Sequence, residues 1–138
     1  MIEIYSKVDR SVLLHAINRL EDMTPGRIDL ASNEQFIQLS SLNMKKGKTF
    51  RPHKHIWKPG EDQVIAQESW VVIRGRVKVI MYDLDDTVVH VDIINPGDCS
   101  LTFRGGHNYV ALDDNTLVYE YKTGPYKGQK NDKQFIEG

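Results

Sequence analysis

Three apolar residues near the start of the chain recur at intervals of four and three positions; they are Leu13, Ile17 and Leu20. This spacing is typical of one face of an amphipathic helix. Asp9 or Ser11 could cap this helix, and the Pro25-Gly26 pair would end it. Before it, Ile2–Tyr5 could form a short edge strand. We therefore expect the first segment, residues 1–34, to supply a strand and a helix that pack on the rest of the domain.

From residue 35 onward the pattern changes to short apolar strands, separated by turn residues at intervals of about eight to twelve positions. Turn signals such as Asn95-Pro96-Gly97 stand between the strands. The expected strands cover residues 35–44, 49–55, 64–74, 77–82, 88–94, 100–103, 108–112 and 116–122. This spacing predicts an all-β fold, a barrel over residues 35–122 with a tail at 123–138.

Length, charge and cysteine usage narrow the function. With 138 residues and 40% hydrophobic content, the chain can form one domain that folds unaided. The 18 basic and 19 acidic residues are mixed along the chain, which gives no electrostatic footprint for nucleic acid or an anionic membrane. Cys99 is the single cysteine, and neither a signal peptide nor a membrane-spanning apolar run is present. We therefore expect a cytoplasmic protein with a small-molecule partner.

The candidate chemistry centres on the stretch that begins at Gly47 and ends at Gly75. Within it, His53 and His55 are two residues apart, so on a strand both imidazoles point to the same face. Gly47 lies six positions before His53, and Glu68 lies seven positions before Gly75. Two imidazoles on one face are half of a metal site.

This arrangement, G-x5-H-x-H followed by E-x6-G, resembles the first motif of the cupin family. The resemblance implies a jelly-roll barrel in which Glu68 joins the two histidines at a metal. The spacer between His55 and Glu68 is longer than cupins usually have, and its Lys-Pro-Gly-Glu-Asp run indicates an inserted loop. Glu61 or Asp62 in that loop could supply the carboxylate instead, but Glu68 has the family distance to Gly75.

The second cupin motif brings one more histidine, and His107 in FRGGHNY stands at nearly the right distance after the turn at residues 95–98. The resemblance thus implies one set of metal ligands: His53, His55, Glu68 and His107. Three imidazoles and one carboxylate suit a divalent ion such as Fe, Ni, Zn, Mn or Cu. Some cupin barrels have lost their metal, so an empty pocket is the alternative.

Arg51 shares the strand face of His53 and His55, so it should point into the barrel with them. Its guanidinium could bind an anionic substrate group, because its fork of donors fits carboxylate or phosphate. The alternative is a structural contact with Glu68, Glu120 or a backbone carbonyl.

Trp70 shares a face with Glu68, so it could form an apolar wall for substrate beside the metal, or it could simply be part of the core. Glu120 is the candidate catalytic base if its strand face points inward. If the parity is reversed, Tyr119 and Tyr121 take that place.

The fragments RPHKH, IRGRVKV and TLVYEYKTGPYKG, followed by Asp132-Lys133, resemble the WbuC-type cupin-fold metalloproteins found with surface-polysaccharide and nucleotide-sugar genes. The similarity runs over residues 35–135. It implies a metal-dependent enzyme of the isomerase or epimerase type, acting on a sugar or nucleotide-sugar-like molecule. The alternatives are a metal-dependent dioxygenase and a metal-binding or small-molecule-binding protein without catalysis.

Two further expectations concern the surface and the tail. Apolar residues at 71–73 and in Val88–Ile94, with the habit of similar cupins to pair sheet to sheet, predict a homodimer. The tail could fold back along the sheet and bring Lys127, Lys130 or Lys133 beside Arg51, favouring an anionic sugar, or it could be a frayed end.

Overall fold

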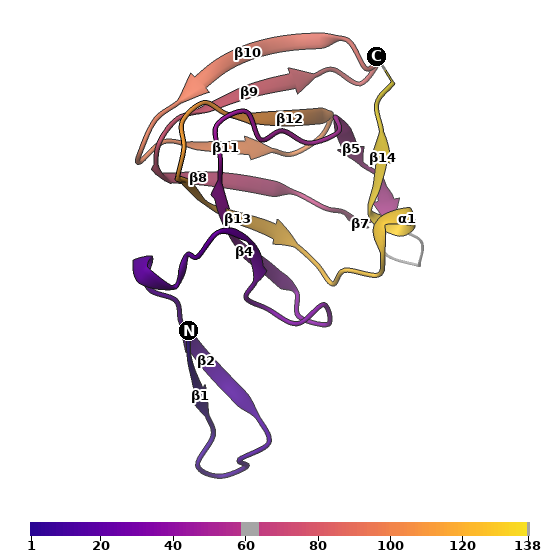
Figure 1. The fold of residues 1–138 in the computed structure, drawn as a ribbon. Coiled ribbons are helices and arrows are strands. Elements are labelled where there is room, and N and C mark those ends of the chain that lie inside the picture. The colour runs from indigo at the N-terminus through magenta and orange to yellow at the C-terminus, as the bar shows by residue number, and fades with distance from the viewer. Residues whose placement is uncertain (59–63, 138) are drawn as a thin grey trace.

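Two five-stranded antiparallel sheets face one another in the computed structural model, which describes residues 1–58 and 64–137 (Figure 1). The first sheet has the order β10 (Val88–Ile94), β9 (Val77–Tyr82), β12 (Gly106–Ala111), β5 (His53–His55) and β14 (Lys133–Phe135). The second has the order β11 (Cys99–Thr102), β8 (Glu68–Arg74), β13 (Thr116–Thr123), β4 (Ile37–Met44) and β3 (Gly26–Asp29). The all-β barrel predicted from the strand pattern is confirmed.

The core fills the space between the two sheets. Its buried members are Leu42, Met44, Trp70, Val72, Val77, Val79, Tyr109, Ala111 and Val118. Along each strand they stand at alternate positions, because successive side chains of a strand point to opposite faces of the sheet. The Tyr109 ring stacks on Trp70, with 3.8 Å between ring centroids, and lies 5.0 Å from the His107 ring. The candidate metal ligands therefore continue the barrel interior.

Gly75 makes the turn between β8 and β9 with a φ of +79°, in the left-handed region that favours glycine. A Cβ at this position would lie 2.5 Å from Thr116 Oγ1. The closing glycine of the sequence motif thus has a steric role: it lets the chain turn tightly against β13.

The expected N-terminal helix is mostly wrong. Strand β2 (Leu13–Ile17) occupies its first half and pairs with β1 (Ile2–Tyr5), so helical structure is limited to one 3-10 turn, η1 (Leu20–Asp22). The residues expected to cap the helix close the hairpin instead, because Asp9 Oδ1 accepts hydrogen bonds from the Ser11 N–H at 3.0 Å and hydroxyl at 2.6 Å. Such local bonds compete with helix formation.

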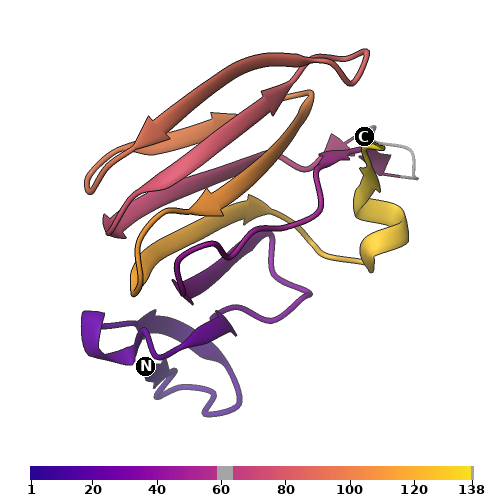
Figure 2. The same ribbon diagram turned by 45° about the horizontal axis from the view of Figure 1, so that its top comes forward.

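The β1–β2 hairpin extends away from the barrel (Figures 1 and 2). Every residue of both strands is exposed, including a group of apolar side chains: Ile2, Ile4, Tyr5, Leu13, Leu14 and Ile17. A two-stranded hairpin is at best marginally stable alone in water. The apolar surface of this hairpin is therefore available for contact with another molecule.

The C-terminal tail folds back onto the first sheet, which is the first of the two alternatives that the sequence left open. After a short helix, α1 (Gln129–Asp132), strand β14 pairs antiparallel with β5. Strand β6 (Trp57–Lys58) pairs with β7 (Val64–Ile65), and the alternative carboxylates Glu61 and Asp62 lie outside the described residues. Among residues 1–58 and 64–137, no helix has the length and apolar content needed to cross a membrane.

Candidate metal centre and surrounding pocket

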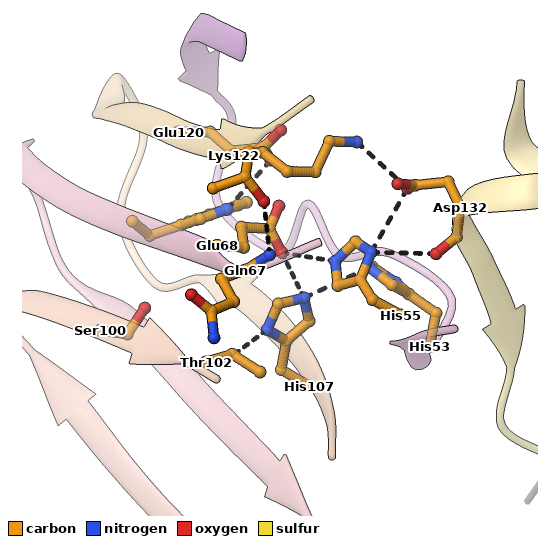
Figure 3. A network of polar contacts seen from close by, with 12 residues as sticks. His53, His55, Gln67, Glu68, Ser100, Thr102, His107, Glu120, Lys122 and Asp132 are labelled. Atoms are coloured by element: carbon orange, nitrogen blue, oxygen red, sulfur yellow. Dashed lines mark hydrogen bonds and ion pairs between the residues drawn. The ribbon is translucent and has the colours of Figure 1, made fainter. Parts of the chain in front are cut away.

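The four residues expected to bind a metal meet inside the barrel (Figure 3). His53 and His55 come from β5, and His107 stands opposite His53 on the neighbouring strand β12. Glu68 begins β8 in the other sheet. One potential ligand atom from each of the four lies within 4.8 Å of the others. The cluster thus joins the two sheets, and all of its members except half-buried His53 are buried.

The outer ring nitrogen of each histidine faces an oxygen. The Nδ1 contacts are His53 with the Arg51 carbonyl at 3.2 Å, His55 with the Asp132 carbonyl and carboxylate at 3.3 Å, and His107 with Thr102 Oγ1 at 2.8 Å. When Nδ1 donates a proton to such a partner, Nε2 keeps its lone pair for a metal. The surroundings therefore orient three imidazoles for coordination through Nε2.

The inner atoms of the cluster are close to one another. His53 Nε2 lies 3.2 Å from His107 Nε2, and His55 Nε2 lies 3.4 Å from Glu68 Oε2, which also contacts His107 Nε2. Three imidazole nitrogens and one carboxylate oxygen thus converge on one point between the two sheets. The donor set of three imidazole nitrogens and one carboxylate suits a borderline divalent ion. The residues present thus fit a divalent metal ion.

The electrostatics of the cluster favour a neutral His53 and an ionised Glu68. Burial lowers the pKa of His53 to about 4, helped by the nearby His107. Burial also disfavours the charged form of His55, but hydrogen bonds to Asp132 and Glu68 outweigh it and raise the pKa of His55 to about 9. Against the effect of burial, His107 and His55 hold the pKa of Glu68 well below its usual range. The cluster thus keeps a buried carboxylate ionised, as metal ligation requires.

Asp132 supports the cluster, and the sequence analysis assigned it no role. Its side chain is 1% exposed, and its Oδ2 lies 3.3 Å from His55 Nδ1 and accepts a hydrogen bond from Lys122 Nζ at 3.2 Å. Burial opposes its charge, but His55 and Lys122 lower the pKa of Asp132 to about 2. It is the only acidic residue in the basic stretch from residue 123 to 135, the one sequence signal that sets it apart.

Glu120 points inward and lines the same cavity as the metal cluster. Its side chain is buried, and it accepts hydrogen bonds from Trp70 Nε1 at 3.0 Å and Arg27 Nη2 at 2.7 Å. Burial and the charge of Glu68 raise the pKa of Glu120 by more than the Arg27 contact lowers it. The inward parity is therefore the one found, and Tyr121 on the other face is exposed. Arg27 was missed from the sequence, because this residue lies just after the expected helix, outside any expected strand.

Trp70 belongs to both the core and the pocket wall. Its side chain is 2% exposed and is stacked on Tyr109, yet its indole N–H holds Glu120. The two readings of this residue are therefore compatible.

Arg51 lies at the cavity but is exposed, in contrast to the buried arginine expected from strand parity. The reason is that β5 begins only at His53, so the strand alternation does not reach Arg51. In the described part of the chain it pairs with neither expected carboxylate, and Glu120 binds Arg27 instead. Its guanidinium lies over the Phe135 ring, 4.1 Å from the centroid.

The cavity has a volume of about 470 Å³, within the range of small-molecule sites. His53, His55 and Glu68 of the cluster line the cavity together with Glu120, aromatic rings and four cations: Arg27, Arg51, Lys122 and Lys133. Of the three tail lysines considered from the sequence, Lys133 alone lines this cavity as described. The pocket therefore combines candidate metal ligands, a buried carboxylate and positively charged side chains.

No protein-family model matches the sequence, and no curated protein matches it. Among solved structures, KdgF from Halomonas sp. is similar with a TM-score of 0.58 and 18% identity, over 75% of this chain and 81% of that one. An uncharacterised double-stranded β-helix protein from Klebsiella pneumoniae is similar with a TM-score of 0.64 and 13% identity, over 91% of this chain and 100% of that one.

The capsular polysaccharide assembling protein CapF from Staphylococcus aureus is similar with a TM-score of 0.63 and 17% identity. The match covers 81% of this chain but 32% of CapF, so it concerns one part of that protein. These likenesses confirm the cupin fold, the double-stranded β-helix barrel, that the two sequence motifs predicted. The narrower resemblance to WbuC-type proteins stays a prediction.

Proposed function

We propose that this protein is a metal-dependent enzyme of the isomerase or epimerase type, acting on a sugar or nucleotide-sugar-like molecule. One divalent ion, Fe, Ni, Zn or Mn, would be held by His53, His55, Glu68 and His107. When bound, the ion supplies Lewis acidity that polarises a carbonyl or hydroxyl oxygen of the ligand.

The single observation that carries the proposal is Glu120, a buried carboxylate in the same cavity as the ligand cluster. The pKa of Glu120 is raised toward neutral pH, which suits a group that both accepts and returns a proton. Trp70 and Arg27 fix its two oxygens through hydrogen bonds. In the proposed reaction Glu120 accepts a proton from the carbon next to the polarised group and returns it to the rearranged substrate.

The comparisons support the substrate class only in outline. CapF is described as a capsular polysaccharide assembling protein, and part of it has the same fold. Fold does not fix function, so the sugar substrate rests on the pocket and on the sequence resemblance together.

Deuterium exchange tests the proposal. Metal-loaded protein is incubated in D₂O with a panel of sugars and nucleotide sugars, and incorporation at carbon is followed by NMR. We expect the wild-type chain to catalyse exchange in at least one compound, and Glu120→Gln to lower the rate by about 100-fold or more at unchanged metal content. Glu34→Gln, at an exposed residue outside the cavity, is the matched control.

Two results would contradict the proposal in different ways. Stoichiometric metal without exchange in any compound would favour the binding protein without catalysis. Exchange that persists at the wild-type rate in Glu120→Gln would remove Glu120 from the role of base.

A further inference from the structure

Two cations flank one aromatic ring at the cavity. The Arg51 guanidinium lies 4.1 Å from the centroid of Phe135, and Lys133 Nζ lies 5.7 Å from it. All three residues line the cavity to which His53, His55 and Glu68 of the candidate metal centre also contribute. The Phe135 ring thus contacts two positively charged side chains beside the candidate metal centre.

Arg51 and Lys133 differ from the other two cations of the cavity in having no ionic partner among the described residues. Arg27 binds Glu120 at 2.7 Å, and Lys122 binds Asp132 at 3.2 Å, so both are neutralised within the chain. Over residues 1–58 and 64–137, Arg51 and Lys133 make neither an ion pair nor a side-chain hydrogen bond. Lys133 is half-buried, and a partly desolvated ammonium without a counter-charge is unfavourable. An anion from solution would supply the negative counter-charge that these two side chains lack among the described residues.

The two cations are fixed relative to the metal cluster by the backbone. The Arg51 carbonyl faces His53 Nδ1 at 3.2 Å, and Lys133 stands opposite His55 where β14 pairs with β5. Strand β5 therefore carries His53 and His55, with Arg51 two residues before it, and the paired strand β14 carries Lys133. One small molecule can contact both sets of residues, because they line one cavity of about 470 Å³.

We propose that Arg51 and Lys133 form a subsite for a carboxylate or phosphate group of a sugar ligand whose remaining part reaches the metal cluster. This inference rests on the proposed function, because it takes the same cavity as the substrate site. A guanidinium offers a fork of donors to such an anion, and an ammonium adds a mobile point charge. The C-terminal tail, which supplies Lys133 and Phe135, becomes part of the ligand site.

Binding titrations on the metal-loaded full chain test the subsite. The probes are glucuronate, which carries a carboxylate, glucose 1-phosphate, which carries a phosphate, and neutral glucose. We expect at least one anionic probe to bind about tenfold or more tightly than glucose, and the better of the two identifies the anion. Arg51→Gln and Lys133→Gln should each weaken that probe by about tenfold, leave glucose unchanged, and lower the salt dependence of binding.

Controls separate the subsite from general effects. Lys130→Gln removes an exposed lysine of the same tail that does not line the cavity, and should leave the affinity unchanged. Lys133→Met keeps the aliphatic stem and should behave as Lys133→Gln does, while metal content shows that the strand pairing is intact. Equal affinity for anionic and neutral probes, binding of none of them, or anion binding that survives both charge removals would overturn the proposal.

The outcome is distinguishable from the fate of the proposed reaction, because binding is measured without turnover. A protein that binds the anionic sugar through Arg51 and Lys133 but exchanges no deuterium keeps the subsite and loses the enzymatic role. Deuterium exchange in a sugar whose binding needs neither Arg51 nor Lys133 keeps the enzymatic role and removes the subsite.

Discussion

Replacing the Asp132 carboxylate by an amide tests whether this tail residue positions a metal ligand. Asp132→Asn keeps the size and shape of the side chain but converts two charge-assisted contacts, with His55 Nδ1 and Lys122 Nζ, into weaker ones. Loss of an outer partner of a metal-binding histidine typically costs 10–100-fold in metal affinity. We expect a loss of about that size, equivalent to about 1.4–2.7 kcal/mol.

The stability of the metal-free chain should fall as well. A hydrogen bond to a charged group contributes roughly 1 kcal/mol more than a neutral one, so two such losses predict about 2 kcal/mol. Asp132→Ala should cost more, about 3–5 kcal/mol, because it leaves Lys122 without its partner in a buried network.

Competition with a metal-binding dye measures the affinity, and urea unfolding of the metal-free protein measures the stability. Asp113→Asn is the control, since Asp113 forms an exposed ion pair with Arg76, and loss of such a pair costs at most about 1 kcal/mol. If Asp132→Asn lost stability but kept the wild-type metal affinity, Asp132 would only hold the tail in place.

The remaining predictions concern the metal itself and the assembly. Changing His53 and His55 together to Ala should abolish stoichiometric metal, measured by elemental analysis, while circular dichroism still shows a folded β protein; undiminished metal would reject the ligand assignment. We propose that the chain forms a homodimer through the exposed apolar side chains of the β1–β2 hairpin and of β10. A sedimentation mass near the 15.9 kDa of one chain at all working concentrations would contradict it.

Two of the four candidate ligands, His53 and His55, could be predicted from the sequence alone because their geometry is local. The His-x-His spacing places two imidazoles on one face of a strand whatever the rest of the fold does. Gly75 fixes the end of β8 through a conformation that favours glycine, and so fixes the position of Glu68 at the start of that strand. His107 needed the family motif, because its place opposite His53 is a long-range pairing.

The N-terminal hairpin shows where periodicity fails. Leu13, Ile17 and Leu20 fit a helical stripe, but Leu13 and Ile17 also share one face of a five-residue strand. A short apolar run is compatible with both structures. The local hydrogen bonds of Asp9 and Ser11, which serve a turn as well as a helix cap, favour the hairpin.

Asp132 and Arg27 were missed for a different reason. Strand parity tells which face a side chain takes, but it does not tell which strands become neighbours. Asp132 reaches His55 because β14 pairs with β5, and Arg27 reaches Glu120 because β3 lies beside β4, one strand from β13. No spacing in the sequence encodes either neighbourhood, so both contacts needed the structure.

The pairing of β14 with β5 links the two halves of the candidate site. Asp132, the last residue of α1, contacts His55 of the candidate metal centre. Lys133 and Phe135 of β14, which follows directly, line the cavity with Arg51. A displacement of this strand pair would change the orientation of His55, a candidate metal ligand, and the position of Lys133 at once. If the tail binds the anionic group of a ligand, the same contact therefore stabilises the arrangement in which His55 is held for the metal, and ligand binding and metal binding should reinforce one another.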